Sequence, residues 1–270
     1  MIPRVASLGM YDRPEVQAAN DRLWAAIAAR LVAQRVERVP DRLDRWRSLA
    51  DVWDDSDLLL AQCCGYPLVT AWRGRLRYVA TPLYDVAGCE GSDHRSRIVV
   101  RHDDPGETLS DFRGRRAAIN EPDSNTGTNL FRAAVAPIAG GQRFFATVTA
   151  TGSHAASARL IAAGGADIAA IDTVSFALIE RHEPRVAANL RTLGWTEAVP
   201  GLPLVTSRST SRRELAALRA ALRMVAADPA LADIRSALFI AGVELIRPAR
   251  YDSIVRIEAR AQRARYPELV

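Results

Sequence analysis

Apolar, β-rich segments alternate with helical patterns along most of the 270 residues, and this alternation constrains the fold more than any other feature. A strand at residues 4–8 leads into a helix over residues 14–31, where Val16, Leu23 and Ile27 recur at helical spacing. The pattern predicts a helix over residues 41–52 and further strands at residues 35–39, 57–63, 78–84, 96–101, 116–120, 144–149 and 167–171. This order predicts the α/β class, with mostly parallel sheets flanked by helices.

Two changes in composition divide the chain into two predicted lobes. Residues 85–96 are polar and contain glycine, which is typical of a crossing between lobes. Residues 190–207 form a proline-containing return, and three amphipathic helices are expected to complete the chain. We therefore expect a discontinuous first lobe of residues 1–86 and 203–270, and a second lobe of residues 87–202.

Charge and apolar patterning exclude several classes of partner. Arginine or aspartate interrupts every apolar segment, so no run reaches the roughly 20 residues of a membrane span and no membrane insertion is expected. All 36 basic residues are arginine, and the formal net charge of +5 mildly favours anionic partners. These arginines are scattered among acidic residues, which indicates a solvated surface and no nucleic-acid binding.

The cysteines and the N-terminal segment bear on the compartment. Cys63 and Cys64 are adjacent and Cys89 is single, so a structural disulfide is not expected. The sequence has no second pair of Cys or His residues at zinc spacing, so no metal site is predicted. The first 16 residues lack the features of a secretory signal. The expectation is a cytoplasmic protein if the chain is complete as written, and a periplasmic or cell-surface protein if an export signal was lost or wrongly assigned.

Three central strands end in polar, turn-forming residues that precede helices, and such ends line the ligand crevice of an open parallel sheet. At the first, Ser124, Asn125 and Thr126 lead into a helix whose unpaired amides and dipole suit an anion, while Gly127 allows a close approach. The alternative is that these residues only cap the helix and the turn. Both interpretations remain open on this segment.

Candidate ligand residues also follow the next two strands. Ser153 and His154 stand at a helix start, where an imidazole nitrogen can donate to an oxyanion. Asp172 ends an apolar strand and either caps the following helix or meets the ligand, which would then have to carry a proton. In the first lobe, Tyr11 and Tyr66 come just after strand ends and are expected to face the crevice from the opposite wall or to pack inside the lobe.

The segments AQCCGYPL, EPDSNTGTN and TGSHAASARLIAAGGADIAAIDTVSF, taken together, resemble the phosphonate-binding periplasmic protein family and its phosphate and phosphite relatives. The resemblance implies a type 2 periplasmic-binding-protein fold with a hinge between two lobes. It places the family's phosphonate-binding Ser-Thr-Ser run on Ser124, Asn125 and Thr126, and the ligand histidine on His154. Ala155 replaces the acidic residue that follows this histidine in aminoalkylphosphonate binders, which argues against 2-aminoethylphosphonate. His94 stands near a position where relatives carry a crevice tyrosine.

The prediction is therefore a non-enzymatic, monomeric solute-binding protein that captures phosphate, phosphite or phosphonate for an ABC transporter permease. No cofactor and no catalytic residue are predicted, because the sequence shows no nucleophile paired with a base and no nucleotide-binding loop. Two alternatives stay open. One is a cytoplasmic enzyme of the same fold that acts on a small carboxylate with His154 or Asp172 as acid or base, and the other is a stand-alone ligand sensor.

Overall fold

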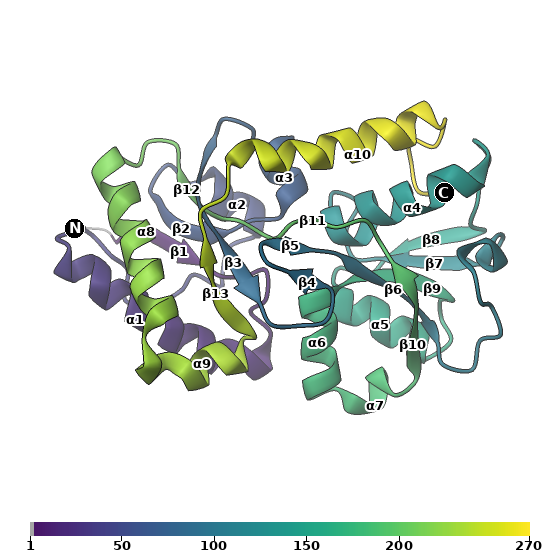
Figure 1. Cartoon of the computed structure of the whole chain (residues 1–270), viewed down its shortest axis with the longest axis horizontal. Helices are drawn as coiled ribbons and strands as arrows, with labels where there is room; N and C mark the ends of the chain where they lie inside the picture. The colour runs from purple at the N-terminus through teal and green to yellow at the C-terminus, as the bar shows by residue number, and fades with distance from the viewer. Residues whose placement is uncertain (1–2) are drawn as a thin grey trace. The chain divides into compact units, whose positions relative to one another are not determined.

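The computed structural model describes residues 3–270 and divides the chain into two compact units (Figure 1). Unit 1 comprises Met1–Asp85 and Pro200–Arg250, and unit 2 comprises Val86–Val199 and Tyr251–Val270. Each unit has one five-stranded sheet flanked by helices. A third, smaller sheet has three short strands. The predicted α/β class is confirmed by this architecture.

Unit 1 is built on a sheet with the strand order β1-β2-β12-β3-β13. Its strands are β1 (Val5–Ser7), β2 (Leu58–Gln62), β12 (Leu204–Ser207), β3 (Leu76–Tyr84) and β13 (Ile240–Glu244). Its helices are η1 (Pro14–Val16), α1 (Gln17–Ala33), α2 (Leu49–Asp54), α3 (Gly65–Val69), α8 (Arg212–Ala227), η4 (Pro229–Leu231) and α9 (Ala232–Ala237), and the turn η5 (Pro248–Tyr251) ends it. The β1–β2 pair is parallel, whereas β2–β12, β12–β3 and β3–β13 are antiparallel.

Unit 2 is built on a sheet with the strand order β10-β6-β9-β7-β8. Its strands are β10 (Leu190–Trp195), β6 (Ser96–Arg101), β9 (Ile168–Asp172), β7 (Arg116–Ile119) and β8 (Thr147–Ala150), and the small sheet contains β4 (Cys89–Glu90), β5 (Asp93–His94) and β11 (Val199–Pro200). Its helical elements are η2 (Leu109–Phe112), the π-helical turn η3 (Asn125–Asn129), α4 (Leu130–Ala139), α5 (His154–Ala162), α6 (Thr173–His182), α7 (Pro184–Ala187) and α10 (Asp252–Arg263). The β7–β8 and β7–β9 pairs are parallel, whereas β6–β9 and β10–β6 are antiparallel.

The sheets are thus mixed, and the expectation of mostly parallel strands was wrong in this detail. Strand β2 is buried along its whole length although one neighbour runs parallel and the other antiparallel. A fully apolar strand reports burial on both faces, and burial alone does not specify the direction of the neighbours.

The core of unit 2 follows the alternation of side chains along its central strand. Ile168 and Ala170 of β9 face one apolar cluster together with Phe131 of α4, and Ala169 and Ile171 face a second cluster together with Phe176 of α6. Both faces of β9 are therefore covered, and its last residue, Asp172, is buried at the carboxyl end of the strand.

The C-terminal helix differs from the prediction, which assigned residues 203–270 to the first lobe. Helix α10 lies beside α4 (Figure 1), and its backbone at Ile254 accepts a hydrogen bond from Asn129 Nδ2 at 3.4 Å. The backbone N–H of Phe144 donates to the carbonyl of Val270 at 2.7 Å, and Tyr266 is buried in the core of unit 2. Burial of this apolar face fixes the C-terminal segment on unit 2, whereas its periodicity predicts only that it has such a face.

No helix within residues 3–270 has both the length and the apolar character needed to cross a membrane.

Candidate functional site

The ends of three parallel strands bring the polar segments of unit 2 together. Strands β7, β8 and β9 run in the same direction, so their carboxyl ends lie at one edge of the sheet. The backbone N–H of Gly152 donates to the carbonyl of Asn120 at 2.9 Å, which joins the segments after β7 and β8. The predicted residues of this unit therefore come from neighbouring turns of one edge.

The turn after β7 starts the helical segment η3 to α4. Ser124 is its N-cap, and the Ser124 Oγ accepts a hydrogen bond from the backbone N–H of Gly127 at 3.1 Å. Asn125 is buried, and its Oδ1 accepts from Asn129 Nδ2 at 3.1 Å. Capping uses the lone pair of the Ser124 hydroxyl and leaves its proton able to donate.

Thr126 and His154 meet across two of these turns. The Thr126 Oγ1 lies 3.0 Å from His154 Nε2, and the Thr126 carbonyl accepts a hydrogen bond from Ser96 Oγ at 2.9 Å. On its other side the imidazole accepts at Nδ1 from the backbone N–H of Asp172 at 3.4 Å. The backbone of Ala170 also hydrogen-bonds the ring, so the partners admit either neutral tautomer, with the proton on Nε2 or on Nδ1.

The His154 ring is neutral at physiological pH. Burial lowers the pKa of His154 to about 4, and this effect outweighs the nearby carboxylate of Asp172, which raises it. The neutral imidazole therefore adds no positive charge to this site.

Asp172 has two roles at the end of β9. Its Oδ1 accepts from the backbone N–H of Ser175 at 2.9 Å and caps α6, as one of the two interpretations of the sequence predicted. Its Oδ2 lies 3.3 Å from Nδ1 of His94 and accepts no hydrogen bond within residues 3–270. Burial raises the pKa of Asp172, but the rings of His94 and His154 and the N–H of Ser175 outweigh it and hold the pKa below its ordinary value. Asp172 is therefore a buried carboxylate at neutral pH.

Asn120 and Gly127 fix the space between the turns. A Cβ added at Gly127 would lie 1.8 Å from Asn120 Oδ1 and 3.1 Å from His154 Cε1, so only glycine fits there. The Oδ1 of Asn120 is buried and has no hydrogen-bond partner among the described residues. The sequence prediction did not include Asn120 as a site residue, although its place at a strand end was the same signal that singled out Asp172.

Other predicted site residues have different surroundings. Ser153 is exposed and caps α5 by accepting from the N–H of Ala156 at 3.1 Å. Tyr11 is buried in unit 1 and meets Tyr84 edge to face, with ring centroids 5.5 Å apart. Tyr66 is half-buried in α3 of unit 1, and its carbonyl accepts from Thr70 Oγ1 at 2.7 Å. Both tyrosines follow the carboxyl ends of the parallel strands β1 and β2, as predicted.

Cys89 lies close enough to Asp172 for that carboxylate to affect its thiol. Burial and the charge of Asp172 raise the pKa of Cys89 to about 12, so the thiol is protonated and is not a nucleophile at neutral pH. None of the three cysteines forms a disulfide, and residues 3–270 contain no group of three or more His, Cys, Asp or Glu side chains that could hold a metal ion.

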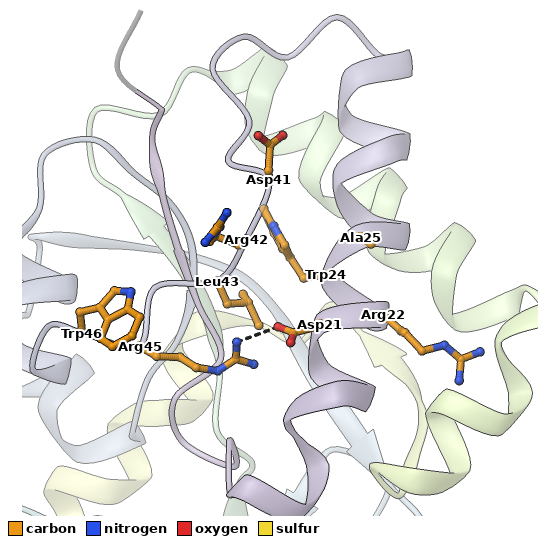
Figure 2. Close-up of a pocket in the computed structure, with 9 residues that line it drawn as sticks. All are labelled: Asp21, Arg22, Trp24, Ala25, Asp41, Arg42, Leu43, Arg45 and Trp46. Carbon is orange, nitrogen blue, oxygen red and sulfur yellow. Dashed lines mark ion pairs between the residues drawn. The ribbon is translucent and has the colours of Figure 1, made fainter.

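A separate hollow of about 550 Å³ lies in unit 1 between α1 and the loop before α2 (Figure 2). Arg45, in its wall, is bound by Asp12 at 2.5 Å and by Asp21 at 2.7 Å, and Trp46 at its rim is 90% exposed. Arg22 and Arg42 also line this hollow, and Arg22 pairs with Asp233 at 2.8 Å. None of the predicted site residues lines it, so the candidate site is the cluster at the edge of the unit 2 sheet.

Comparison with known proteins places this geometry in context. A family model for the periplasmic, phosphonate substrate-binding protein of ABC transporters matches residues 60–251. A binding protein component of an ABC phosphonate transporter from Pseudomonas aeruginosa superposes with a TM-score of 0.75 at 14% identity, covering 98% of this chain and 88% of that chain. PhnD1 from Prochlorococcus marinus, solved in complex with methylphosphonate, gives a TM-score of 0.72 at 15% identity, with 97% and 98% of the two chains covered.

A Xanthomonas citri protein solved with bound chloride ion gives a TM-score of 0.72 at 17% identity and covers 98% of both chains. No curated protein sequence matches the chain. At such identities the likeness establishes the fold, and the predicted two-lobe periplasmic-binding-protein fold is confirmed.

Proposed function

The chain belongs to the family of periplasmic phosphonate-binding proteins of ABC transporters, and on that premise we propose that it captures phosphate, phosphite or a phosphonate through the start of η3 and His154. Members of this family are the substrate-binding components of ABC transporters, so a solute-binding role and a permease partner follow from membership of the family. The ligand and its contacts are the proposal.

The contact between Thr126 and His154 carries this proposal. If Nε2–H of His154 donates to Thr126 Oγ1, the proton of that hydroxyl has to point elsewhere and is free to donate to a ligand oxygen. Ser124 has the same property, because its Oγ already accepts from Gly127. The first amides of the helix and its dipole add partial positive charge at the same place.

The low basicity of His154 argues against the enzyme alternative. A general base has to accept a proton, but burial lowers the pKa of His154 to about 4. The imidazole is therefore a weak base for activating the Thr126 hydroxyl as a nucleophile. Asp172, the other candidate, is engaged as the cap of α6.

Isothermal titration calorimetry with methylphosphonate, phosphite, phosphate and sulfate tests the proposal. At least one of the phosphorus oxyanions should give saturable heat. Thr126→Val should lower the affinity about 10- to 100-fold, because a hydrogen bond to a charged ligand contributes about 1.5–3 kcal/mol. The matched control is Thr147→Val, on the exposed start of β8, which should bind like the wild-type protein. The absence of heat and of a thermal shift with all four ligands contradicts the proposal.

The tyrosines of unit 1 remain predicted ligand contacts. Tyr66→Phe removes one hydroxyl from a half-buried ring, and a loss of methylphosphonate affinity without a loss of stability would support a contact. An unchanged affinity would assign Tyr66 to packing in unit 1. The predicted monomeric state is checked in the same samples by analytical ultracentrifugation.

A further inference from the structure

Helix α8 of unit 1, which lies beside α1 (Figure 1), carries its charge at the surface almost entirely as arginine. Four arginines occupy its exposed or half-buried positions, and a fifth on β3 donates to the backbone just before the helix starts. These five residues are called the α8 arginine face: Arg77, Arg212, Arg213, Arg219 and Arg223. The solvent side of a helix usually carries both signs of charge, so a face of one sign needs an explanation.

Carboxylates at the two ends of α8 are engaged with other arginines. Glu214, the one acidic residue of the helix, binds Arg4 at 2.7 Å. Asp228, which follows the last turn, pairs with Arg30 of α1. Within residues 3–270 no carboxylate forms an ion pair with any member of the α8 arginine face. The positive charge of this face is therefore not neutralised by the chain itself.

The arrangement is electrostatically unfavourable for the isolated chain. Arg212 and Arg213 occupy the first two positions of α8, where the helix dipole disfavours cations. Arg219 and Arg223 are four residues apart on one helix, a spacing at which like charges destabilise it. Burial lowers the pKa of Arg219, and the neighbouring charges of Arg77 and Arg223 lower it further. An anionic partner would turn each of these unfavourable interactions into a favourable one.

Support of the fold accounts for only part of the α8 arginine face. The Nε of Arg219 donates to the carbonyl of Val79 at 3.0 Å, and Nη2 donates to that of Tyr78 at 3.3 Å, so this side chain stabilises β3. Arg77 Nη1 donates to the carbonyl of Thr210 at 2.6 Å. The side chains of the other three arginines form no hydrogen bond or ion pair with the described part of the chain. Packing and hydrogen bonding therefore do not explain them.

The geometry of the face selects a flat partner. Arg212, Arg219 and Arg223 follow one another at spacings of seven and four residues, so they form one stripe about 16 Å long on the helix surface. None of the five arginines lines either of the two hollows described in unit 1, and Met224 is the one exposed large apolar side chain of α8. Protein interfaces depend on apolar or aromatic anchors that enter pockets. A planar layer of anions needs neither.

We propose that the α8 arginine face binds the anionic headgroups of a lipid bilayer and holds unit 1 at the membrane surface without inserting into it. Guanidinium groups bind phosphate oxygens by paired, charge-assisted hydrogen bonds, and lipid phosphates present such oxygens in one plane. The chain belongs to a family of ABC transporter components, and the permease of such a transporter is a membrane protein, so a bilayer lies within reach of its binding protein. This inference goes beyond the proposed function, because the face belongs to unit 1 and the oxyanion site to unit 2.

Co-sedimentation of the whole chain with lipid vesicles tests the inference. One set of vesicles contains about 30% phosphatidylglycerol in phosphatidylcholine, and the other contains phosphatidylcholine alone. The wild-type protein should bind the anionic vesicles and leave the zwitterionic ones unbound. Binding should weaken as the salt concentration rises from about 0.05 M to about 0.3 M, because salt screens interactions between exposed charges.

The double variant Arg212→Gln/Arg223→Gln removes two arginines whose side chains have no partner in the described chain. Its affinity for the anionic vesicles should fall about 10- to 30-fold, since each arginine near an anionic surface contributes about 5-fold. Its melting temperature should stay the same or rise, because the variant relieves repulsion and an unfavourable interaction with the helix dipole. Arginines retained only for stability would give the opposite shift.

The matched control is Arg256→Gln/Arg263→Gln on α10 of unit 2. Both side chains are exposed, and the control changes the net charge of the protein by the same amount. It should bind the anionic vesicles like the wild-type protein. An equal loss in the two double variants would show that net charge governs binding and would overturn the assignment to α8.

Other anions separate a lipid surface from the remaining partners. Pyrophosphate that releases the protein from vesicles more strongly than sodium chloride of equal ionic strength would indicate a compact phosphate site and overturn the proposal. Release by soluble polyglutamate under the same conditions would indicate an acidic protein segment and would overturn it as well. Wild-type protein that ignores anionic vesicles at about 0.05 M salt contradicts the proposal directly. None of these outcomes depends on the heat of methylphosphonate binding, which tests the proposed function separately.

Discussion

Replacement of Gly127 by alanine tests the packing on which the site depends. The added Cβ would lie 1.8 Å from Asn120 Oδ1, 2.8 Å from Asn120 Cγ and 3.1 Å from His154 Cε1. Nonbonded carbon contacts are normally about 3.5–4.0 Å, so the Asn120 side chain has to retreat by about 1.5–2 Å. The room for this movement is small, because the Asn120 oxygen is already buried.

The expected loss of stability is about 2 kcal/mol. Overpacking costs about 1–3 kcal/mol, and an overlap of this size has a cost near the upper end of that range. Alanine is favoured over glycine inside a helix by about 1 kcal/mol, which offsets part of this cost. Without the overlap, helix propensity alone would make the variant more stable. Displacement of His154 should also weaken its contact with Thr126 and lower methylphosphonate affinity about 10-fold.

Urea unfolding followed by circular dichroism, on a double-mutant cycle with Asn120→Ala, measures this effect. Asn120→Ala removes both close atoms, so the double variant should recover at least about 1 kcal/mol relative to the sum of the single changes. Gly194→Ala is the matched control, since no atom lies within 4 Å of the Cβ it would add. Additive effects in the cycle, or a Gly127→Ala variant as stable as Gly194→Ala, would refute the steric argument.

Three further predictions use stability measurements. The pKa of Asp172 is lowered in the folded state, so its carboxylate stabilises the fold above the pKa that it has in the unfolded chain. This stability is lost as the pH falls through the pKa of the folded state. Asp172→Asn should therefore flatten the acid limb of a plot of melting temperature against pH. Gly88→Ala places a Cβ 2.4 Å from the Trp195 ring at a residue with φ +97, so the urea midpoint should fall clearly, and an unchanged midpoint contradicts the packing. Trp46, 90% exposed, should tolerate alanine within about 0.5 kcal/mol in urea titrations, whereas Trp53, 6% exposed, should lose about 3–5 kcal/mol; equal losses would contradict the burial assigned to them.

Periodicity and polar strand ends predicted much of unit 2 from the sequence. The strand expected at residues 96–101 is β6, and those expected at 116–120 and 167–171 are β7 and β9 within one residue. The turns after β7 and β9 were assigned correctly because a buried apolar strand followed by turn-forming residues has one simple interpretation. Strand β8 is largely exposed and runs over Thr147–Ala150, later than the strand expected at residues 144–149. Convergence of these turns then follows from the parallel direction of the three strands.

The segment before α2 was mispredicted because local hydrogen bonds replaced helix formation. Residues 35–39 form no strand, since Arg35 and Arg38 adopt left-handed φ values of 59 and 54. The helix expected over residues 41–52 begins only at Leu49. The Asp44 side chain accepts from the N–H groups of Trp46 and Arg47 at 3.0 and 3.2 Å, and such Asx turns compete with helix formation. The strands β10, β12 and β13 and the small three-stranded sheet were also missed.

Partners within the site depend on tertiary structure and had weaker signals. The sequence placed His154 and Asp172 at strand ends but gave no means of knowing that the backbone of one would meet the ring of the other. Asn120 lies opposite Gly127 because η3 turns back over β7, and a single sequence does not reveal that closeness. His94 reaches Asp172 from a two-residue strand, which is too short for any periodicity.

The net charge of the whole chain is a poor guide to the charge of this site. The formal charge of +5 favours anions, yet many of the arginines form ion pairs, as Arg116 does with Asp167 at 2.7 Å. An arginine in the site would hold an oxyanion by a bidentate, charge-assisted pair whatever its protonation state. The proposed hydroxyl and amide donors would hold an oxyanion more weakly than such a pair. Such a site suits reversible capture, because release requires no separation of a buried ion pair.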